Sequence, residues 1–382
     1  MKKEKSILII ENSNHYHVLD HLCDFYKNKG YEVTLALTWT MDKDMIIDMF
    51  EDYKSFKIID IKSKNFFFWK LLFKRKDYDY IHISTGAENT YLKFLLNIFI
   101  FFIFTFFNKK KIILQIRNTK YYLISKNIKK YFKVNFKKYK KVFFFNFLIY
   151  SFSNFFRSLT LKNCIACIFE SNTQLIFFNR YTNNKFSNKG YYLYSANLKK
   201  EIVTSHASHV KITIGVPGSY SPQRRNYDTL ITALSTISDT NCSKIKLIFV
   251  GNFSNIDSYY LNFFKKKKIE VIYFQKFVST ENYKSIMGDC DYILSLHKKE
   301  GHPFTFAGSG IIGDLSSFRL KMIINYIFDP FGEFYKKSIY YSDLSILFKR
   351  LLDNNFNKSD FISNKKNKLI NCKYNYLHNF KI

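Results

Sequence analysis

The sequence predicts an α/β protein with two doubly wound parallel sheets in tandem. Three observations lead to this class. The chain has 382 residues, a length that suits two domains. Its composition, 47% hydrophobic and 24% charged, is that of an ordinary globular protein and excludes a disordered chain or a collagen-like repeat. Short apolar runs alternate with amphipathic runs along most of the chain, as strands and helices do in α/β domains.

The first half of the chain contains one complete alternating series. Residues 6–10 form an apolar run of strand type, 15–29 have helical spacing closed by Gly30, and 31–37 return to strand spacing. Further strands are expected at 57–61, 80–84, 111–116 and 164–169. Strands that are apolar along their whole length and alternate with helices predict a parallel sheet covered on both faces. We assign residues 1–200 to this Rossmann-like domain.

A polar stretch near 198–209 separates this series from a second one. Its expected strands are 211–216, 244–250, 270–274, 291–296 and 321–325, and its expected helices are 227–237, 257–267, 280–287 and 309–320. We assign 207–350 to a second Rossmann-like domain, and 351–382 to a tail, expected to be helical and to pack back across both domains. Two such domains in tandem predict an interdomain cleft at the carboxyl ends of their strands.

The charge and the aromatic content depart from average values. The formal net charge is +30, aromatic residues reach 19%, and only eight of the 60 basic residues are arginine. An A+T-rich gene would produce part of this excess of lysine, phenylalanine and tyrosine. A surface this positive still attracts anionic lipid or nucleic acid.

Two segments combine apolar and basic residues. Residues 92–107 are almost wholly apolar but fall short of the roughly 20 residues that cross a bilayer, and 127–156 mix lysine with phenylalanine and tyrosine. We expect peripheral contact with an anionic membrane; the alternative is two large core helices of the first domain.

The apolar run after the basic N-terminus is too short for a signal peptide, and the six cysteines form no convincing metal or redox motif. We therefore expect a cytoplasmic protein on the inner face of the plasma membrane.

Two loops carry the residues best suited to bind phosphate. Gly308, Ser309 and Gly310 let the backbone approach a phosphate at the start of the expected helix 309–320, and Asp314 lies one turn further on, within reach of a ribose hydroxyl. Simple capping of that helix by Ser309 is the alternative.

The second loop, 215–227, contains the only adjacent arginines of the chain, Arg224 and Arg225. A guanidinium binds phosphate through a planar fork that lysine lacks. The alternative is a surface pair that neutralises helix carboxylates.

Together these segments resemble the nucleotide-sugar-binding domain of GT-B-fold glycosyltransferases, particularly bacterial enzymes that assemble capsule, O-antigen or other surface polysaccharide. The resemblance covers 215–227, 251–252, 277–283, 289–295 and 309–314 with 321–324. It implies that Gly308, Ser309 and Gly310 bind the diphosphate, that Asp314 binds ribose, and that Arg224 or Arg225 neutralises phosphate.

The chain departs from the family's pattern in one acidic position. Retaining members often carry two glutamates eight residues apart; the second would fall on Asp314 and the first on Phe306. Three polar residues of the preceding loop are instead expected to face the donor sugar. They are His297, Glu300 and His302, with Glu300 a candidate catalytic residue.

The first domain offers candidates for an acceptor-activating base. Its first strand is followed by a polar loop with Glu11, His15 and His17, residue types that can accept a proton near neutral pH; helix capping and surface histidines are the alternative. Further expected acceptor or donor contacts are Glu88, Arg117 and Asn118.

The predicted function is transfer of a sugar from a nucleotide sugar to a lipid-linked or surface-polysaccharide acceptor. No metal or cofactor is required, because cationic side chains and a helix N-terminus can stabilise the leaving diphosphate. One alternative is a nucleotide-sugar epimerase of the same architecture. Another is a basic nucleic-acid-binding protein, which is less favoured because the aromatic residues cluster in apolar runs and not between exposed basic residues.

Overall fold

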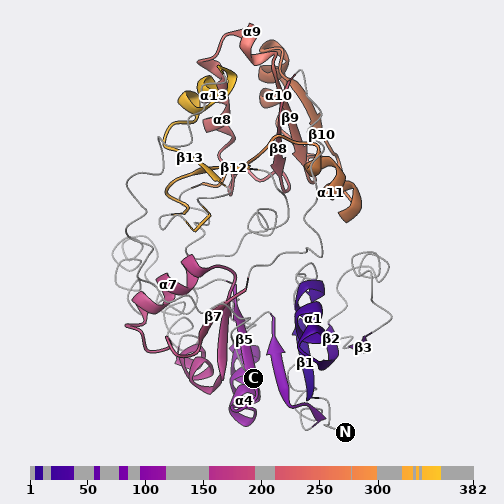
Figure 1. Cartoon of the computed structure of the whole chain (residues 1–382), viewed down its shortest axis with the longest axis vertical. Coiled ribbons are helices and arrows are strands. Elements are labelled where there is room, and N and C mark those ends of the chain that lie inside the picture. Colours follow the sequence, from indigo (N-terminus) through magenta and orange to yellow (C-terminus); the bar gives the residue numbers. More distant parts are fainter. Residues whose placement is uncertain are drawn as a thin grey trace, which may run out of the picture. The chain divides into compact units, whose positions relative to one another are not determined.

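The computed structural model describes residues 5–11, 19–37, 56–60, 77–84, 95–117, 155–193, 211–276, 278–298, 321–329, 333–334 and 338–353. They fall into two compact units (Figure 1): the first unit holds the described residues up to 193, and the second holds those from 211 onward. The boundaries predicted at 200 and 207 lie outside the described residues, and the predicted interdomain cleft stays a prediction.

The first unit contains a seven-stranded parallel sheet with the order β3-β2-β1-β4-β5-β6-β7. The chain moves from β1 outward to β3 and then returns to the other side of β1, so β1 and β4 flank the point where the winding reverses. The strands are β1 (Lys5–Glu11), β2 (Tyr31–Leu37), β3 (Lys57–Asp60), β4 (Tyr80–Ile83), β5 (Ile112–Ile116), β6 (Ala166–Phe169) and β7 (Gly190–Tyr192).

Helices cover both faces of this sheet because its strands are apolar on both sides. In β1, Ile7 and Ile9 pack with the helix α1 (Leu19–Asn28). The alternate residues Leu8 and Ile10 pack on the other face with α4 (Leu95–Phe107). A third helix, α7 (Asn172–Tyr181), follows β6. This two-sided burial is the pattern from which the parallel sheet was predicted.

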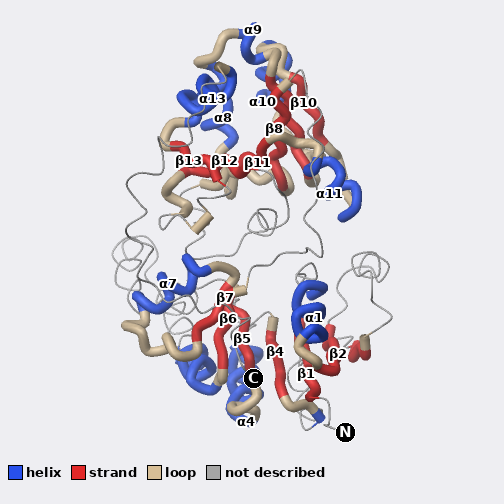
Figure 2. The backbone as a smooth tube through the Cα atoms, viewed as in Figure 1, coloured by secondary structure: helices blue, strands red, loops and turns tan. Residues whose placement is uncertain are grey.

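The second unit contains a six-stranded parallel sheet with the order β10-β9-β8-β11-β12-β13 (Figure 2). Its strands are β8 (Ile212–Pro217), β9 (Ile245–Val250), β10 (Glu270–Tyr273), β11 (Tyr292–Leu294), β12 (Lys321–Asn325) and β13 (Ser338–Tyr341). Its helices are α8 (Tyr227–Ser235), α9 (Asp239–Cys242), α10 (Ser258–Lys266), α11 (Thr280–Gly288) and α13 (Leu344–Leu352).

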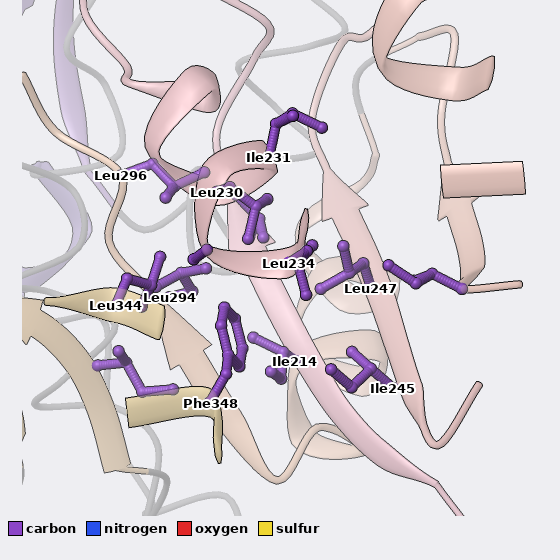
Figure 3. Packing of buried hydrophobic residues seen from close by; sticks show 14 of the residues in the cluster. Ile214, Leu230, Ile231, Leu234, Ile245, Leu247, Leu294, Leu296, Leu344 and Phe348 are labelled. Atoms are coloured by element: carbon purple, nitrogen blue, oxygen red, sulfur yellow. The ribbon is translucent and has the colours of Figure 1, made fainter. Parts of the chain in front are cut away.

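The core of the second unit lies between the sheet and helices α8 and α13. Leu234 of α8 and Phe348 of α13 converge on Ile214 and Leu247 from the central strands (Figure 3). Leu351 belongs to the same cluster, so this core extends past residue 350. Side chains at the helix starts cap free N–H groups: Asn226 accepts from Thr229 at the start of α8.

The predicted fold class is confirmed. Both sheets are parallel and doubly wound, as the alternating pattern indicated. The expected strands are present, whereas the edge strands β7 and β13 and the helices α7, α9 and α13 were not predicted. The helix expected at 309–320 and most of the expected tail lie outside the described residues. Among the helices that the structure describes, none is long and apolar enough to span a bilayer.

Candidate functional site

The carboxyl ends of β8, β9 and β11 lie at one edge of the second sheet, since all three strands are parallel. Here the loops after β8 and β9 touch. A Cβ atom on Gly251 would lie 2.6 Å from the carbonyl carbon of Gly218 and 2.7 Å from the nitrogen of Ser219. The Gly218 N–H also donates to the Val250 carbonyl at 2.8 Å. Glycine at 251 therefore permits a close approach of two backbones that any side chain would prevent.

Arg225 lies against the first of these loops. Gly218 has φ +90°, and a Cβ atom there would overlap Nη2 of Arg225, so the guanidinium rests directly on the glycine backbone. Arg225 is half-buried, whereas the neighbouring Arg224 is exposed. The two adjacent arginines, which the sequence could not distinguish, thus have different surroundings.

Backbone hydrogen bonds join the arginine loop to the end of β11. The Asn226 N–H donates to the Leu296 carbonyl at 2.6 Å, and the Lys298 N–H donates to the Arg224 carbonyl at 2.9 Å. Arg225 and His297 therefore form an isolated antiparallel bridge. This pairing places a histidine beside the arginine at the edge where ligands of doubly wound sheets bind.

His297 is buried and held on two sides. Its Nδ1 lies 2.8 Å from the Oγ of Ser295, and its ring meets the ring of Phe328 edge-on with centroids 6.1 Å apart. Ser295 is itself fixed, because its N–H donates to the Ile323 carbonyl of β12 at 2.9 Å. The histidine ring thus contacts a serine that is anchored in the sheet.

Helix α8 begins two residues after Arg225, with Asn226 as its N-cap. The first turn of a helix carries free N–H groups and partial positive charge, which favour an anion. Tyr227 opens the helix beneath the ring of Tyr220, with centroids 5.2 Å apart. Burial raises the pKa of Tyr227 to about 12, although the charge of Arg225 opposes that rise. Asn226 already caps the Thr229 N–H of this turn and Asp228 places a carboxylate in it, so the positive charge of this edge comes from the Arg225 guanidinium, which suits a phosphate group.

A hollow of about 490 Å³ lies further along the same edge, after β10. It is lined by Phe274, Gln275, Lys276, Val278, Ser279, Asn282, Ser285 and Ile286. Its aromatic ring can stack on a planar ring of a ligand. Its amide and hydroxyl groups can form hydrogen bonds with the same ring.

The carboxyl edge of the first unit carries a buried charge cluster. Glu11 ends β1, Ser84 follows β4, Arg117 follows β5 and Glu170 follows β6. The Ser84 hydroxyl donates to the Glu11 carboxylate. Arg117 lies between both acids, with Nη2 3.9 Å from Glu11 and Nε 3.7 Å from Glu170, and its Nε donates to the Ser84 carbonyl at 3.1 Å.

Burial shapes the titration of this cluster. It raises the pKa of Glu170, and the nearby charge of Arg117 only partly opposes that rise. Gln174 supports the cluster from α7, because its amide donates to the Arg117 carbonyl at 3.3 Å and its oxygen accepts from the Glu170 N–H at 3.0 Å. His82, in β4, is buried beside this cluster. Burial is the main cause that lowers the pKa of His82 to about 3, and the charge of Arg117 lowers it further, so this imidazole is neutral.

The structure describes five of the predicted site residues. Arg225 and His297 come together at one edge, Glu11 and Arg117 at the other, and Arg224 points to solvent. Ten others lie outside the described residues, so their roles stay predictions: His15, His17, Glu88, Asn118, Glu300, His302, Gly308, Ser309, Gly310 and Asp314.

Three residues of these edges were not singled out from the sequence: Ser84, Glu170 and Ser295. Ser84 ends an expected strand and Glu170 directly follows one, so the rule that drew attention to Glu11 would have found these two; Ser295 lies inside the expected strand 291–296 and follows the shorter observed strand β11. Within the described part of the chain, no group of three His, Cys, Asp or Glu residues could hold a metal ion. That no metal is needed stays a prediction.

No protein-family model and no curated protein sequence matches the chain. Among solved structures, it is similar to a glycosyltransferase from Rickettsia africae, with TM-score 0.53, 12% identity, and 91% of this chain and 87% of that chain covered. It is also similar to the lipopolysaccharide outer core galactosyltransferase WaaB, with TM-score 0.53, 10% identity and coverage of 92% and 91%. A third is WaaG, a glycosyltransferase of lipopolysaccharide biosynthesis, with TM-score 0.51, 11% identity and coverage of 91% and 90%. At these identities the likeness establishes the fold, and the chain has the two Rossmann-like sheets of GT-B proteins.

Proposed function

We propose that this protein is a glycosyltransferase that moves a sugar from a nucleotide sugar to a glycan or lipid-linked acceptor at the cytoplasmic face of the membrane. The observation that carries the proposal is the placement of Arg225. Its guanidinium lies against the Gly218 backbone, beside His297 and before the first turn of α8. This edge offers a diphosphate a planar cation.

The chemistry requires stabilisation of a leaving group. The bond between the sugar's anomeric carbon and the diphosphate oxygen breaks, a bond to the acceptor oxygen forms, and the acceptor hydroxyl loses its proton to a base. Negative charge grows on the diphosphate as it leaves, and pre-positioned cations and N–H dipoles stabilise that charge most when they need not reorganise. Arg225, held between the glycine loop and the end of β11, meets this condition.

The base is proposed to come from the first unit. Glu11 was one candidate, but its carboxylate has no exposed surface and is bound by Ser84 beside Arg117. A residue that deprotonates an acceptor must touch it. We therefore favour His15 or His17, in the polar segment that follows Glu11, and assign Glu11 to the support of that strand end.

The similar structures support this choice of reaction. The three proteins compared above are described as glycosyltransferases, two of them of lipopolysaccharide. A shared fold at this identity does not transfer a substrate. The proposal of a surface-polysaccharide acceptor therefore has three grounds. They are this likeness, the edge at Arg225 that suits a phosphate, and the surface of exposed phenylalanines, described next, that suits a membrane.

Membrane contact is proposed for the surface of α4 and the helix that contains Phe155. Four phenylalanines are exposed there: Phe99 by 40%, Phe106 by 50%, Phe107 by 59% and Phe155 by 59%. The Lys109 ammonium lies 5.8 Å from the centre of the Phe106 ring. Exposed rings next to lysines suit the headgroup region of an anionic bilayer, where rings enter and ammonium groups meet phosphate.

Vesicle flotation tests this membrane contact. With phosphatidylglycerol-containing vesicles, the double variant Phe106→Ser, Phe107→Ser should reduce the bound fraction by about tenfold or more, because each ring contributes apolar area to insertion. Tyr259→Ser is the matched control, since Tyr259 is equally exposed but lies on the second unit. Equal binding of the double variant and the wild-type protein would contradict the assignment of this surface.

A two-stage experiment tests the reaction. A thermal-shift screen against nucleoside diphosphates and nucleotide sugars should show one selective ligand, because a ligand of the folded state raises the unfolding temperature by mass action. The protein is then incubated with that nucleotide sugar and membrane extract, and the products are identified by mass spectrometry. Sugar attached to lipid is expected. An epimerised nucleotide sugar without transfer, or RNA binding without any nucleotide-sugar effect, would overturn the proposal.

A further inference from the structure

The carboxylate of Asp329 accepts three hydrogen bonds just past the end of β12. Its Oδ1 accepts from the Glu333 N–H at 2.9 Å and its Oδ2 from the Phe334 N–H at 2.9 Å. The Tyr340 hydroxyl of β13 also donates to Oδ2. Burial, together with the charge of Asp329, raises the pKa of Tyr340, so this hydroxyl keeps the hydrogen that it donates. Asp329, itself 1% exposed, thus ties the segment after β12 to the neighbouring strand.

Phe328 is held by the chain on both sides of it. A turn precedes it at the end of β12: Oδ1 of Asn325 accepts from the Ile327 N–H at 3.1 Å, and the Phe328 N–H donates to the Asn325 carbonyl at 3.0 Å. Asp329 with its three bonds follows. The Phe328 ring is buried and meets the His297 ring edge-on, with centroids 6.1 Å apart. The backbone held on each side of Phe328 therefore determines where this ring lies against the histidine.

His297 connects Phe328 to the arginine edge. Its backbone pairs with that of Arg225 in an isolated antiparallel bridge. Buried side chains are closely packed, so one of them moves only if its neighbours move as well. Contacts therefore run without a break from Asp329, through Phe328 and His297, to Arg225.

We propose that Asp329 is a positioning residue of the nucleotide-sugar site. By fixing the segment after β12, its carboxylate holds Phe328 against His297, and this contact keeps the bridge to Arg225 in place. The inference rests on the proposed function for its ligand and deepens it, because it makes β12 and β13 part of the support of the site. A binding group that is already in position loses less freedom when the ligand arrives. Loss of the carboxylate should therefore weaken binding, although no group that meets the ligand is removed.

Two variants and one control separate positioning from general stability. Asp329→Asn keeps the size of the side chain, but its NH2 group must face an N–H or O–H donor, so at least one of the three bonds is lost. Tyr340→Phe is milder, since it removes one donor and keeps both backbone bonds. Asp343→Ala is the matched control: the Asp343 carboxylate also accepts from an N–H and a hydroxyl, both of Ser345, but it does so at the start of α13.

Proton NMR of the histidine rings tests the contact without any ligand. His297→Asn identifies the resonances of this ring by their loss, and Phe328→Leu shows where they lie without the neighbouring aromatic ring. Asp329→Asn should move them toward the Phe328→Leu positions, and Tyr340→Phe should move them part of the way. Asp343→Ala should lower stability through loss of a helix cap and leave them in place. Unmoved resonances in Asp329→Asn, or in Tyr340→Phe if the first variant does not fold, would overturn the proposal.

Calorimetric titration with the nucleoside diphosphate selected by the screen tests the effect on binding, at a temperature where each variant is folded. Asp329→Asn should raise Kd by about 2- to 30-fold, the range for residues that influence a site through their neighbours, and Asp343→Ala should leave Kd unchanged. Moved His297 resonances with an unchanged Kd for Asp329→Asn would overturn the assigned role in binding. If the wild-type protein binds no nucleotide, the proposed function fails, whereas the NMR result still decides whether Asp329 positions His297.

Discussion

Arg117 and Arg225 both follow a strand at the carboxyl edge of a parallel sheet, but they have different surroundings. Arg117 is buried between the carboxylates of Glu11 and Glu170, whereas Arg225 is half-buried against the backbone of Gly218 and next to His297. The first guanidinium is matched by charges of its own chain. The second is the residue that we propose to bind the phosphate of a ligand. The comparison shows that topology brings both arginines to an edge, and that their neighbours decide what each one does.

The largest expected effect is on the first edge. Arg117→Ala leaves two carboxylates facing each other without their cation in a buried position, and loss of one partner from such a cluster destabilises a protein by about 3–5 kcal/mol. Circular dichroism in a urea titration measures the free energy of unfolding. A loss below about 1 kcal/mol would show that Arg117 is not the centre of this cluster.

The next effect concerns the glycine contact that supports Arg225. Gly251→Ala would force apart the loops after β8 and β9, since a Cβ atom there meets the backbone of Gly218 at 2.6 Å. Overpacking of this kind typically costs about 1–3 kcal/mol. The second unit should unfold at lower urea by circular dichroism, and nucleotide binding should weaken with it. Unchanged stability and unchanged binding would contradict the close packing of these loops.

A smaller effect on stability is expected at Glu170, one of the two acids around Arg117. Because the folded state raises the pKa of Glu170, that proton is held more tightly when the chain is folded. The associated stabilisation is fully present below the unfolded pKa, about 4.5, and is lost as pH rises through the folded value. Glu170→Gln keeps the shape without the charge. Relative to the wild-type protein, this variant should gain stability between acidic and neutral pH in urea titrations, and a relative loss over that range would reverse the assignment.

Much of the fold could be predicted because buried parallel strands are continuous apolar runs. The missed strands are short edge strands: Gly190–Tyr192 and Ser338–Tyr341 each include tyrosines beside small residues, so they lack that signature. The ends of the expected strands also predicted that Glu11, Arg117, Arg225 and His297 lie at the carboxyl edge of a sheet, and they do. Their partners could not be predicted, because Arg117 and Glu170 meet only through the pairing of β5 with β6, 53 residues apart along the chain.

The difference between Arg224 and Arg225 gives the most direct test of the second edge. The nucleoside diphosphate selected by the thermal-shift screen is titrated by calorimetry into the wild-type protein and the two single alanine variants. Arg225→Ala should raise Kd by about 10- to 100-fold, as expected for loss of a charge-assisted hydrogen bond. The exposed Arg224→Ala should raise it less than about threefold. Equal affinities for all three proteins, or a larger loss for Arg224→Ala, would contradict the assignment of this edge as the phosphate site.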